Sequence, residues 1–416
     1  MSPPTPAPST APRVRPTIAD VAAEAGVSKA TVSRYFNHRE RLLSPDIAAR
    51  VEAAIAKLAY VPSPMAQALS HGRSRLIGLV VADITNPYSV AVLRGAEKAC
   101  QDAGYLVMLF NLGNDRERER AAIDALASYQ VDGFILNTLG QGEGQADVNT
   151  LHGKPAVLVD RRHAGLAADF VSLDNQGAMR EACAHLQQQG WQRLLYITQP
   201  LLGVSSRIER TEAFRALVSS KGSAVRGAVL ELAAEQGDEV LDQALTDLLR
   251  QARPGERCAV VAGNSVVTLR VAASVSRMGW TFGQQLGFVG FDDPEWASLI
   301  RPGLSAVAQP TDAIGQRAAQ CLLERINGLE GPARESLLPG LLVVRGSSLG
   351  PAVCFAALAL AHRRGLFSSP SSFRCALCQT PLWTPPASAP SPSIWTTRSG
   401  PSGPPSRGLR VCCWTG

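Results

Sequence analysis

The side chains with the clearest chemical purpose lie close together near the N-terminus, between Thr17 and Asn37, in TIADVAAEAGVSKATVSRYFN. The second half of this stretch combines a lysine and an arginine with several hydroxyls. Such cations and hydroxyls hold phosphate oxygens, and side chains of this kind also reach the edges of bases. The chemistry that the stretch favours is therefore recognition of DNA.

Two short helices joined by a tight turn are predicted to position these side chains. Thr17 can cap the first helix, and Asp20 three residues later favours its positive end. Gly26 ends this helix. Its apolar face is formed by residues at helical spacing, namely Ile18, Val21, Ala22 and Ala25.

The second helix begins after Ser28, which can cap it. Val27 and Val32 can fill the gap between the helices, and the residues that then face outward are Lys29, Ala30, Ser33 and Arg34. A helix with this polar, basic face can enter a DNA major groove. Two small helices around a glycine turn also occur in proteins that never touch DNA, so the spacing alone leaves both interpretations open.

The order of residues is more specific than their spacing. The elements D-V-A at Asp20 to Ala22, A-G-V-S at Ala25 to Ser28 and T-V-S-R at Thr31 to Arg34 closely resemble the DNA-binding headpiece of the LacI/purine-repressor family. This resemblance implies base-reading positions at Lys29, Ala30 and Arg34, and phosphate anchors at Thr31 and Ser33. It completes the DNA-binding set of the headpiece with Thr17, Ser28 and Asn37.

A third helix is predicted after Ser44 and Pro45, because a capping serine is followed by proline at the first helical position. Its apolar stripe consists of Ile47, Val51, Ile55 and Leu58. Pro62 stops the helix. We expect it to close the core of a headpiece that spans residues 16–62, after a disordered arm at 1–15 that is rich in proline, serine and threonine.

Residues 63–74 form a hinge or linker in which SPMAQALS is far shorter than the roughly 12 to 15 residues that an isolated helix needs. The resemblance identifies this segment as a hinge helix that forms on the operator. It implies DNA contacts by Met65, Ala66 and Leu69, with Leu69 wedged into the minor groove. The alternative is that Leu69 packs on the core.

Charge is distributed unevenly along the 416 residues, whose net charge is +6. Lysine and arginine outnumber acids by 10 to 5 in residues 1–75, whereas residues 76–350 carry 25 cations and 30 acids. This pattern favours a DNA-binding head on an acidic body. The chain has neither the apolar run of a signal peptide nor the roughly 20 apolar residues of a membrane span, so a cytoplasmic protein is expected.

From Leu76 onward, apolar runs alternate with amphipathic stretches, which is typical of parallel sheets covered on both faces by helices. The predicted strands are LIGLVVA, YLVMLF, GFILN, PAVLVD, VSLD, LLYIT, CAVVAG, LGFVGFD, LSAVAQP and LLVVRGSS. Helices are predicted at about 87–103, 115–129, 206–220, 238–252 and 312–328, and a further helix is predicted to end at Met278. The fold class is therefore α/β.

The order of these elements resembles the periplasmic-binding-protein-like core of the same family, with two doubly wound parallel-sheet subdomains. We place the effector-binding and dimerisation core at 75–348, divided into 75–174 and 175–304 with later crossovers. The implied ligand cleft lies between the subdomains. The resemblance covers about residues 16–348.

The resemblance also implies the residues of the effector site. Arg210 matches the arginine that grips the ligand, and Asp292 matches the acid that accepts its hydroxyls, while Asp160 ends a strand at the same cleft. Arg161, Arg162 and Arg207 can offer guanidinium groups to a carboxylate, although two arginines after a strand often form a solvated loop. The expected effector-binding set is Tyr88, Asp160, Arg161, Arg207, Arg210, Asn264 and Asp292.

Two departures from the family pattern bear on this site. Ala262-Gly263-Asn264 replaces the usual A-N-D, and Ser89 stands where an aromatic residue often stacks on a purine. The serine argues against a nucleobase. The N-terminal half resembles the gluconate and ketogluconate repressors within the family, so a sugar acid such as gluconate or 2-ketogluconate is the expected effector.

Histidine and cysteine spacings indicate no enzyme, metal or cofactor chemistry. The six histidines lack HExxH or other ligand spacing. Cysteines in apolar contexts are expected to be buried thiols, namely Cys100, Cys183, Cys258 and Cys321. The glycine-rich stretch at 140–144 lacks the Gly-x-Gly-x-x-Gly spacing and is interpreted as a loop.

The tail at 349–416 differs from the rest: from Gly350 onward it has no acid, five of the nine cysteines and runs such as TPPASAPSPS. We interpret it as a disordered appendage produced by a frame change. Cys375 and Cys378 have zinc-like spacing, but Cys412 and Cys413 do not.

Among the classes of function, a ligand-responsive repressor accounts for headpiece, hinge and core together. It is expected to be a homodimer on a pseudo-palindromic double-stranded operator. The alternatives are an activator with the same fold, a response to a neutral sugar, or a solute-binding sensor. An enzyme is not expected.

Overall fold

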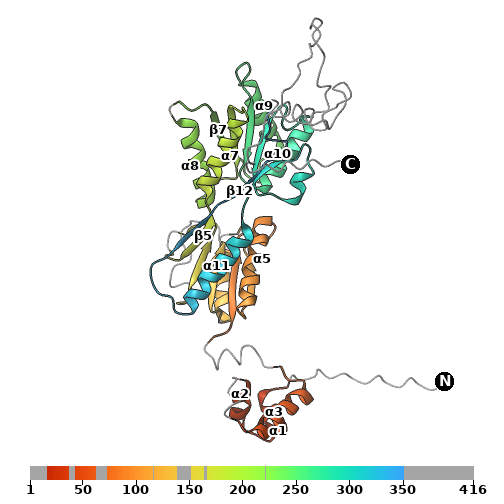
Figure 1. Ribbon diagram of the computed structural model, residues 1–416, viewed down its shortest axis with the longest axis vertical. Coiled ribbons are helices and arrows are strands. Elements are labelled where there is room, and N and C mark those ends of the chain that lie inside the picture. Colours follow the sequence, from red (N-terminus) through yellow and green to blue (C-terminus); the bar gives the residue numbers. More distant parts are fainter. Residues whose placement is uncertain are drawn as a thin grey trace, which may run out of the picture. The chain divides into compact units, whose positions relative to one another are not determined.

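The computed structural model describes residues 16–36, 43–61, 73–115, 117–137, 151–163, 166–220 and 222–350 (Figure 1). Within these ranges lie a helical headpiece and a core of two sheets. Several sequence predictions fall outside the described residues: Asn37, the hinge residues Met65, Ala66 and Leu69, the loop at 140–144 and the tail from 351 onward.

The headpiece consists of α1 (Ile18–Ala25), α2 (Lys29–Phe36) and α3 (Pro45–Leu58). One valine from each helix is completely buried, and together these three, Val21, Val32 and Val51, form the centre of the core. The predicted caps are confirmed, because the Thr17 hydroxyl accepts from the amide of Asp20 and the Ser44 hydroxyl accepts from the amide of Ile47. The three-helix prediction is therefore confirmed.

The first subdomain of the core has a six-stranded, fully parallel sheet in the order β11-β5-β4-β3-β1-β2. Its strands are β1 (Leu76–Val81), β2 (Leu106–Asn111), β3 (Gly133–Asn137), β4 (Ala156–Val159), β5 (Asp169–Leu173) and β11 (Glu335–Leu338). Its helices are α5 (Pro87–Asp102), α6 (Arg118–Ser128) and α11 (Thr311–Ile326). The buried strands β1, β3 and β4 are nearly continuous apolar runs, as a sheet covered on both faces requires, whereas the equally buried β5 includes Asp169 and Ser172.

The second subdomain repeats this plan in the order β12-β10-β9-β8-β6-β7, with only β12 antiparallel to its neighbour. Its strands are β6 (Arg193–Thr198), β7 (Arg226–Glu231), β8 (Cys258–Ala262), β9 (Gly287–Phe291), β10 (Ser305–Ala308) and β12 (Leu341–Val343). Its helices are α7 (Asn175–Gln188), α8 (Ser205–Ser219), α9 (Asp238–Arg250), α10 (Ser265–Arg277) and the short 3-10 helix η2 (Glu295–Ser298).

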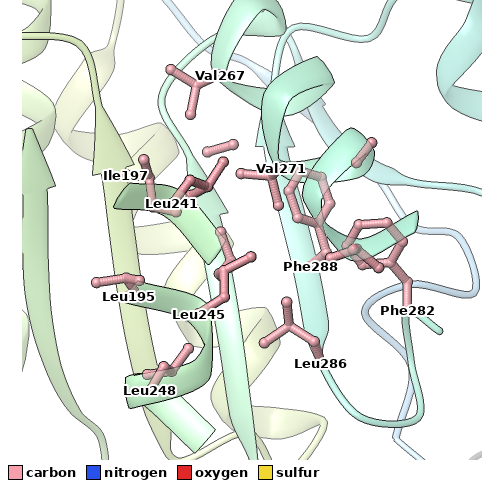
Figure 2. Packing of buried hydrophobic residues seen from close by; sticks show 14 of the residues in the cluster. Leu195, Ile197, Leu241, Leu245, Leu248, Val267, Val271, Phe282, Leu286 and Phe288 are labelled. Carbon is pink, nitrogen blue, oxygen red and sulfur yellow. The ribbon is translucent and has the colours of Figure 1, made fainter. Parts of the chain in front are cut away.

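One face of this second sheet is covered by α9 and α10, as Figure 2 shows. Leu241 and Leu245 of α9 pack toward Leu195 and Ile197 of β6, and Phe288 of β9 stacks obliquely on Phe282 with ring centres 5.2 Å apart. The apolar spacing of α9 follows one helix face, which explains why the sequence predicted it correctly.

The chain passes between the two sheets three times. It crosses from β5 to α7 at Asp174, from β10 to α11 at Gln309 and Pro310, and from β11 to β12 at Pro339 and Gly340. The carboxyl ends of the strands of both sheets therefore lead toward these crossings. In such open α/β sheets, ligands bind in the crevice outside the carboxyl ends of the strands.

Four elements of the core were not predicted from the sequence: α7, β7, β11 and the short η2. Strands β7 and β11 are sheet edges with mixed burial, so their residues RGAVLE and ESLL lack a continuous apolar run. The predicted strand LLVVRGSS is also wrong in length, because β12 ends at Val343. Within the described chain, no helix is long and apolar enough to cross a membrane.

Candidate DNA-binding helix and effector cleft

The start of α1 is held by a reciprocal capping box. The Thr17 amide donates to the Asp20 carboxylate at 2.7 Å, and the Asp20 amide donates to the Thr17 hydroxyl at 3.4 Å. Hydrogen bonds from the Thr17 backbone and hydroxyl lower the pKa of Asp20. The first helix thus begins at a defined residue, which sets the position of the turn that follows.

The turn between α1 and α2 is fixed by a residue that sequence reasoning missed. Gly26 adopts the left-handed conformation with φ 64°, and Arg50 of α3 donates to the carbonyls of Ala25 at 2.6 Å and Gly26 at 3.0 Å. A Cβ atom at residue 26 would lie 2.6 Å from the Arg50 guanidinium. Glycine therefore satisfies both the backbone conformation and the close approach of α3.

Helix α2 turns the predicted DNA-binding residues away from the core. Ser28, Lys29, Ala30 and Arg34 are exposed, whereas Val32 is fully buried. The Ser28 hydroxyl accepts from the Thr31 amide at 3.1 Å and lies 2.9 Å from the Thr31 hydroxyl. Neither Lys29 nor Arg34 forms an ion pair with another described residue. Both cations are consequently available for an anionic partner.

Two aspartates of the predicted cleft occupy equivalent places in the two sheets. Asp160 follows β4 and Asp292 follows β9, and both have left-handed backbones, with φ 65° and φ 70°. The amide of Asp160 donates to the Val171 carbonyl and that of Asp292 to the Val307 carbonyl, each at 3.0 Å. Each subdomain thus places one carboxylate at the carboxyl edge of its sheet.

Asp292 is already bound within the protein. Its carboxylate accepts from the Ser265 amide at 2.9 Å and from the Gln309 side chain at 2.6 Å. Asp292, Ser265 and Gln309 line a hollow of about 470 Å³ together with Tyr88. Gln309, which sequence reasoning missed, belongs to a crossing between the sheets and is therefore brought to the site only by the fold.

Tyr88 is buried, and its hydroxyl has no hydrogen-bond partner in the described chain. Burial, and next the negative charge of Asp160, raise the pKa of Tyr88 well above its ordinary value, with a further contribution from Asp292. The charges of Arg210 and Arg161 act in the opposite direction. The phenol therefore lies within electrostatic reach of four of the other predicted effector residues, and it stays protonated as a hydrogen-bond donor.

A larger hollow of about 870 Å³, open to solvent, is lined by two of the predicted arginines, Arg161 and Arg207. Arg207 donates to the Pro200 carbonyl and to the Gln199 side chain, both at 2.7 Å. Burial and the neighbouring charge of Arg161 lower the pKa of Arg207 to about 10. Arg207 remains charged at neutral pH and has only uncharged acceptors among the described residues, whereas Arg161 lies 3.4 Å from Asp160.

Arg210 is buried and connects three elements of the second subdomain. It donates to the Asn175 side chain at 2.8 Å and to the Gly263 carbonyl at 2.7 Å, and its guanidinium stacks 4.2 Å from the centre of the Phe291 ring. A Cβ atom at residue 263 would lie 3.1 Å from the Tyr196 hydroxyl. The glycine that departs from the family pattern is thus part of a tightly packed contact.

Two of the predicted residues have structural partners that limit their role. Asn264 caps α10 by accepting from the Val267 amide at 2.9 Å, and it donates to Gln199 at 2.8 Å. The prediction that Arg162 belongs to the cationic rim is wrong. Its side chain pairs with Glu335 at 2.6 Å and Glu209 at 3.4 Å, which already neutralise it.

No group of three or more histidine, cysteine or acidic side chains in the described ranges could hold a metal ion. The four cysteines that the structure describes are buried free thiols, as the sequence predicted. Burial raises the pKa of Cys100 and Cys258 to about 11. These thiols are therefore protonated and unreactive at neutral pH.

Residues 17–63 match the family model of bacterial regulatory proteins, lacI family, and residues 183–348 match that of a periplasmic binding protein-like domain. The HTH-type transcriptional regulator PtxS of Pseudomonas plecoglossicida is 45% identical over 336 residues, which cover 81% of this chain and 96% of that protein. The chain belongs to the lacI family of bacterial regulatory proteins. The HTH-type transcriptional regulator KdgR of Bacillus subtilis is 35% identical over 331 residues, which cover 80% of this chain and 97% of that protein.

Solved structures of the lacI family agree with this assignment at the level of the fold. The lac repressor dimer bound to operator and the anti-inducer ONPF matches 81% of this chain and 100% of that chain, with a TM-score of 0.68 and 24% identity. The transcriptional regulator CelR in complex with cellobiose matches 80% and 100%, with a TM-score of 0.57 and 26% identity. The predicted α/β class, with a helix-turn-helix headpiece and a periplasmic-binding-protein-like core, is confirmed.

Proposed function

We propose that this lacI-family regulator is a repressor that holds a pseudo-palindromic operator and is released by a sugar acid such as gluconate or 2-ketogluconate. The observation that supports an acidic effector is the environment of Arg207. This half-buried cation shares a hollow with Arg161 and has only uncharged acceptors among the described residues. A ligand carboxylate in that hollow would offset the unfavourable burial of the charge.

Recognition of DNA is assigned to the exposed face of α2. Lys29, Ala30 and Arg34 read bases, because they lie at the N-terminal end and on the outer face of the second helix. Thr17, Ser28, Thr31 and Ser33 anchor phosphates through their hydroxyls. Asn37, Met65, Ala66 and Leu69 complete the proposed contacts and lie outside the described residues.

A two-fold operator requires two headpieces, so the proposed active form is a homodimer. This proposal is supported by membership of the lacI family and by the solved structure of the lac repressor, which is a dimer bound to operator. Because the operator of a bacterial regulator lies on the chromosome, the proposed place of action is the cytoplasm.

Recognition of the sugar hydroxyls is assigned to the smaller hollow. A carboxylate can accept from two adjacent hydroxyls, and Asp292, which lines this hollow, provides one. Asp160 provides a second carboxylate at the matching strand end of the first subdomain. The protonated Tyr88 hydroxyl adds a donor. Because these groups come from both subdomains, an effector that contacts all of them favours one relative arrangement of the two sheets. Release follows if that arrangement is incompatible with operator binding.

A neutral sugar is the second candidate effector, because Asp160 and Asp292 can bind sugar hydroxyls even if the ligand itself carries no carboxylate. Relatives include the ribose operon repressor of Escherichia coli, which is 29% identical over 80% of this chain. The two candidates differ in their use of Arg207. Whether such a regulator represses or activates transcription depends on the position of the operator, so activation at some promoters is compatible with the same site.

Isothermal titration with 2-ketogluconate, gluconate, ribose and cellobiose tests the effector. We expect binding of at least one acid, and in Arg207→Gln a loss of about tenfold or more, since a charge-assisted hydrogen bond contributes about 1.5 to 3 kcal/mol. Arg193→Gln is the matched control. Like Arg207, Arg193 donates to a glutamine side chain and a backbone carbonyl, in this case both of Gln251. Arg193 is the first residue of β6, whereas the acceptors of Arg207 follow the last residue of that strand. Tight binding of a neutral sugar with no response to either acid contradicts the proposal.

A further inference from the structure

The point where the described core begins is tied down by a buried carboxylate. Asp132, in the turn between α6 and β3, accepts from the Ser74 amide at 2.9 Å, the Ser74 hydroxyl at 3.1 Å and the Arg75 amide at 2.9 Å. The Asp132 amide in turn donates to the Leu76 carbonyl at 2.8 Å. Residues 74–76 are therefore anchored to the sheet and act as a fixed point.

Arg73 is held on the other side by a different element. Its guanidinium donates to the Asn327 side chain at 2.8 Å and to the Ile326 carbonyl at 2.9 Å, at the end of α11. The last carbonyls of a helix carry partial negative charge, so a cation there is favourable. Arg73 belongs to the end of the 63–74 linker and is its first described residue, so its contact connects that segment to α11.

Helix α11 cannot move independently of α5. A Cβ atom on Gly95 would lie 2.2 Å from the Asp312 carbonyl oxygen, and one on Gly315 would lie 2.1 Å from that of Val92. The two backbones are therefore in direct contact, as Figure 1 shows for the pair in the first subdomain. Over its 16 residues α11 spans about 24 Å as one rigid body with α5.

The opposite end of this helix pair lies at the effector cleft. Thr311, the first residue of α11, lines the smaller hollow together with Pro87 and Tyr88 of α5. Two residues earlier, Gln309 donates to the Asp292 carboxylate at 2.6 Å. A ligand that engages Asp292 competes with this bond, and only Pro310 separates Gln309 from the helix.

We infer that α11 transmits the state of the cleft to the hinge, and that Arg73 is the positioning residue at which the signal leaves the core. The inference rests on the proposed repressor function. Asp132 and the end of α11 hold consecutive residues of the linker from two sides, so the linker follows the first subdomain when an effector at the cleft end of α11 shifts it. Without Arg73 the linker is held by Asp132 alone, and residue 73 no longer follows that shift. Loss of Arg73 should therefore uncouple effector from operator without removing either binding site.

The test uses the full-length protein and the DNA duplex that it selects from a random-sequence pool. In the unaltered protein we expect 2-ketogluconate to weaken duplex binding, and duplex binding to slow hydrogen exchange in the last turn of α11. In Arg73→Gln we expect the effector-dependent loss of duplex affinity to shrink by about fivefold or more and the exchange difference to disappear. Asn327→Ala, which removes one of the two acceptors, should act in the same direction.

Arg75→Gln is the matched control. It removes the same charge from the same linker, and the Arg75 side chain makes no hydrogen bond or ion pair with another described residue. Melting temperatures of the variants establish that the core is folded. If Arg73→Gln and Arg75→Gln respond alike to effector and duplex, the inference is wrong. Failure of the unaltered protein to select any duplex contradicts the repressor function itself, and the inference falls with it.

Discussion

At the scale of single residues, several of the proposed binding positions carry polar groups that lack a charged or hydrogen-bonding partner among the described residues. Lys29 and Arg34 have no ion pair in the described headpiece, Tyr88 has a buried hydroxyl without a partner, and Arg207 has only uncharged acceptors. Tyr88 and Arg207 are desolvated at a cost in free energy that a ligand can offset, whereas the exposed Lys29 and Arg34 are hydrated and can exchange water for DNA. Lys29, Arg34 and Arg207 can therefore bind an anionic group, and Tyr88 can donate a hydrogen bond to a ligand.

Replacement of Arg34 by Ala tests base reading by α2. A bidentate contact of arginine with guanine contributes about 1 to 3 kcal/mol of discrimination, so operator affinity should fall by that amount and affinity for random DNA by less. Competition gel shifts at one salt concentration measure both. Lys57→Ala is the control for loss of one headpiece charge, because Lys57 lies on α3 and pairs with Glu24 at 2.7 Å. Equal losses on both DNAs would leave only a phosphate contact.

Tyr88→Phe should have effects of opposite sign on stability and on binding. Removal of a buried hydroxyl without a partner should raise the stability of the unliganded core by about 1 kcal/mol, because the desolvation penalty of that group disappears. The effector should bind about tenfold more weakly if it accepts a hydrogen bond from Tyr88. Thermal melting and titration of one preparation measure the two effects. A fall in stability with unchanged affinity would contradict the assignment.

At the scale of elements, a cluster of charged side chains at the first residue of β5 holds parts of the first subdomain together. The buried carboxylate of Asp169 accepts from Arg325 of α11 at 2.7 Å and from Arg334, just before β11, at 2.6 Å. Burial opposes ionisation, but the hydrogen bonds from Arg325 and Arg334 outweigh it and hold the pKa of Asp169 well below its ordinary value. One residue thus fastens a helix and an edge strand to the sheet.

This cluster predicts how stability depends on pH. Because the pKa of Asp169 is lower in the folded than in the unfolded chain, its contribution is complete above the unfolded pKa of about 3.9 and is lost as pH falls below it. Asp169→Asn should lower the free energy of unfolding by about 2 to 4 kcal/mol at pH 7, and this difference should narrow toward pH 3. Denaturant titrations at both pH values measure it. A constant difference would show that the charge of Asp169 contributes nothing.

At the scale of the whole molecule, the proposed homodimer couples two headpieces to one operator, and the proposed hinge contact makes binding specific. Leu69→Gly should keep salt-sensitive binding to random DNA, which depends on the charges of the headpiece, but lose operator bending and most specific affinity. Gel-shift assays with bent and linear probes, combined with sedimentation of the protein–operator complex, measure bending and the number of chains. Normal bending by the variant, or one chain per operator, would overturn this part of the proposal.

Local structure followed from the sequence because its causes lie within a few residues. The capping pair Thr17 and Asp20, the left-handed Gly26 and the helical spacing around Val32 act over one or two turns, so helix boundaries and the exposed face of α2 could be predicted. The same holds for the long apolar strands, whereas the short edge strands β7 and β11 have no comparable local signal.

Only the tertiary structure decided which residues share a site. Asp160 and Asp292 become equivalent because two sheets place them at matching strand ends, and Arg162 leaves the expected cationic rim because acids from distant segments pair with it. Arg73 meets Asn327 across 254 residues of sequence, a contact that no local pattern encodes. Such contacts depend on the strand order and on three chain crossings, which arise from packing of the whole core and not from the preferences of its segments.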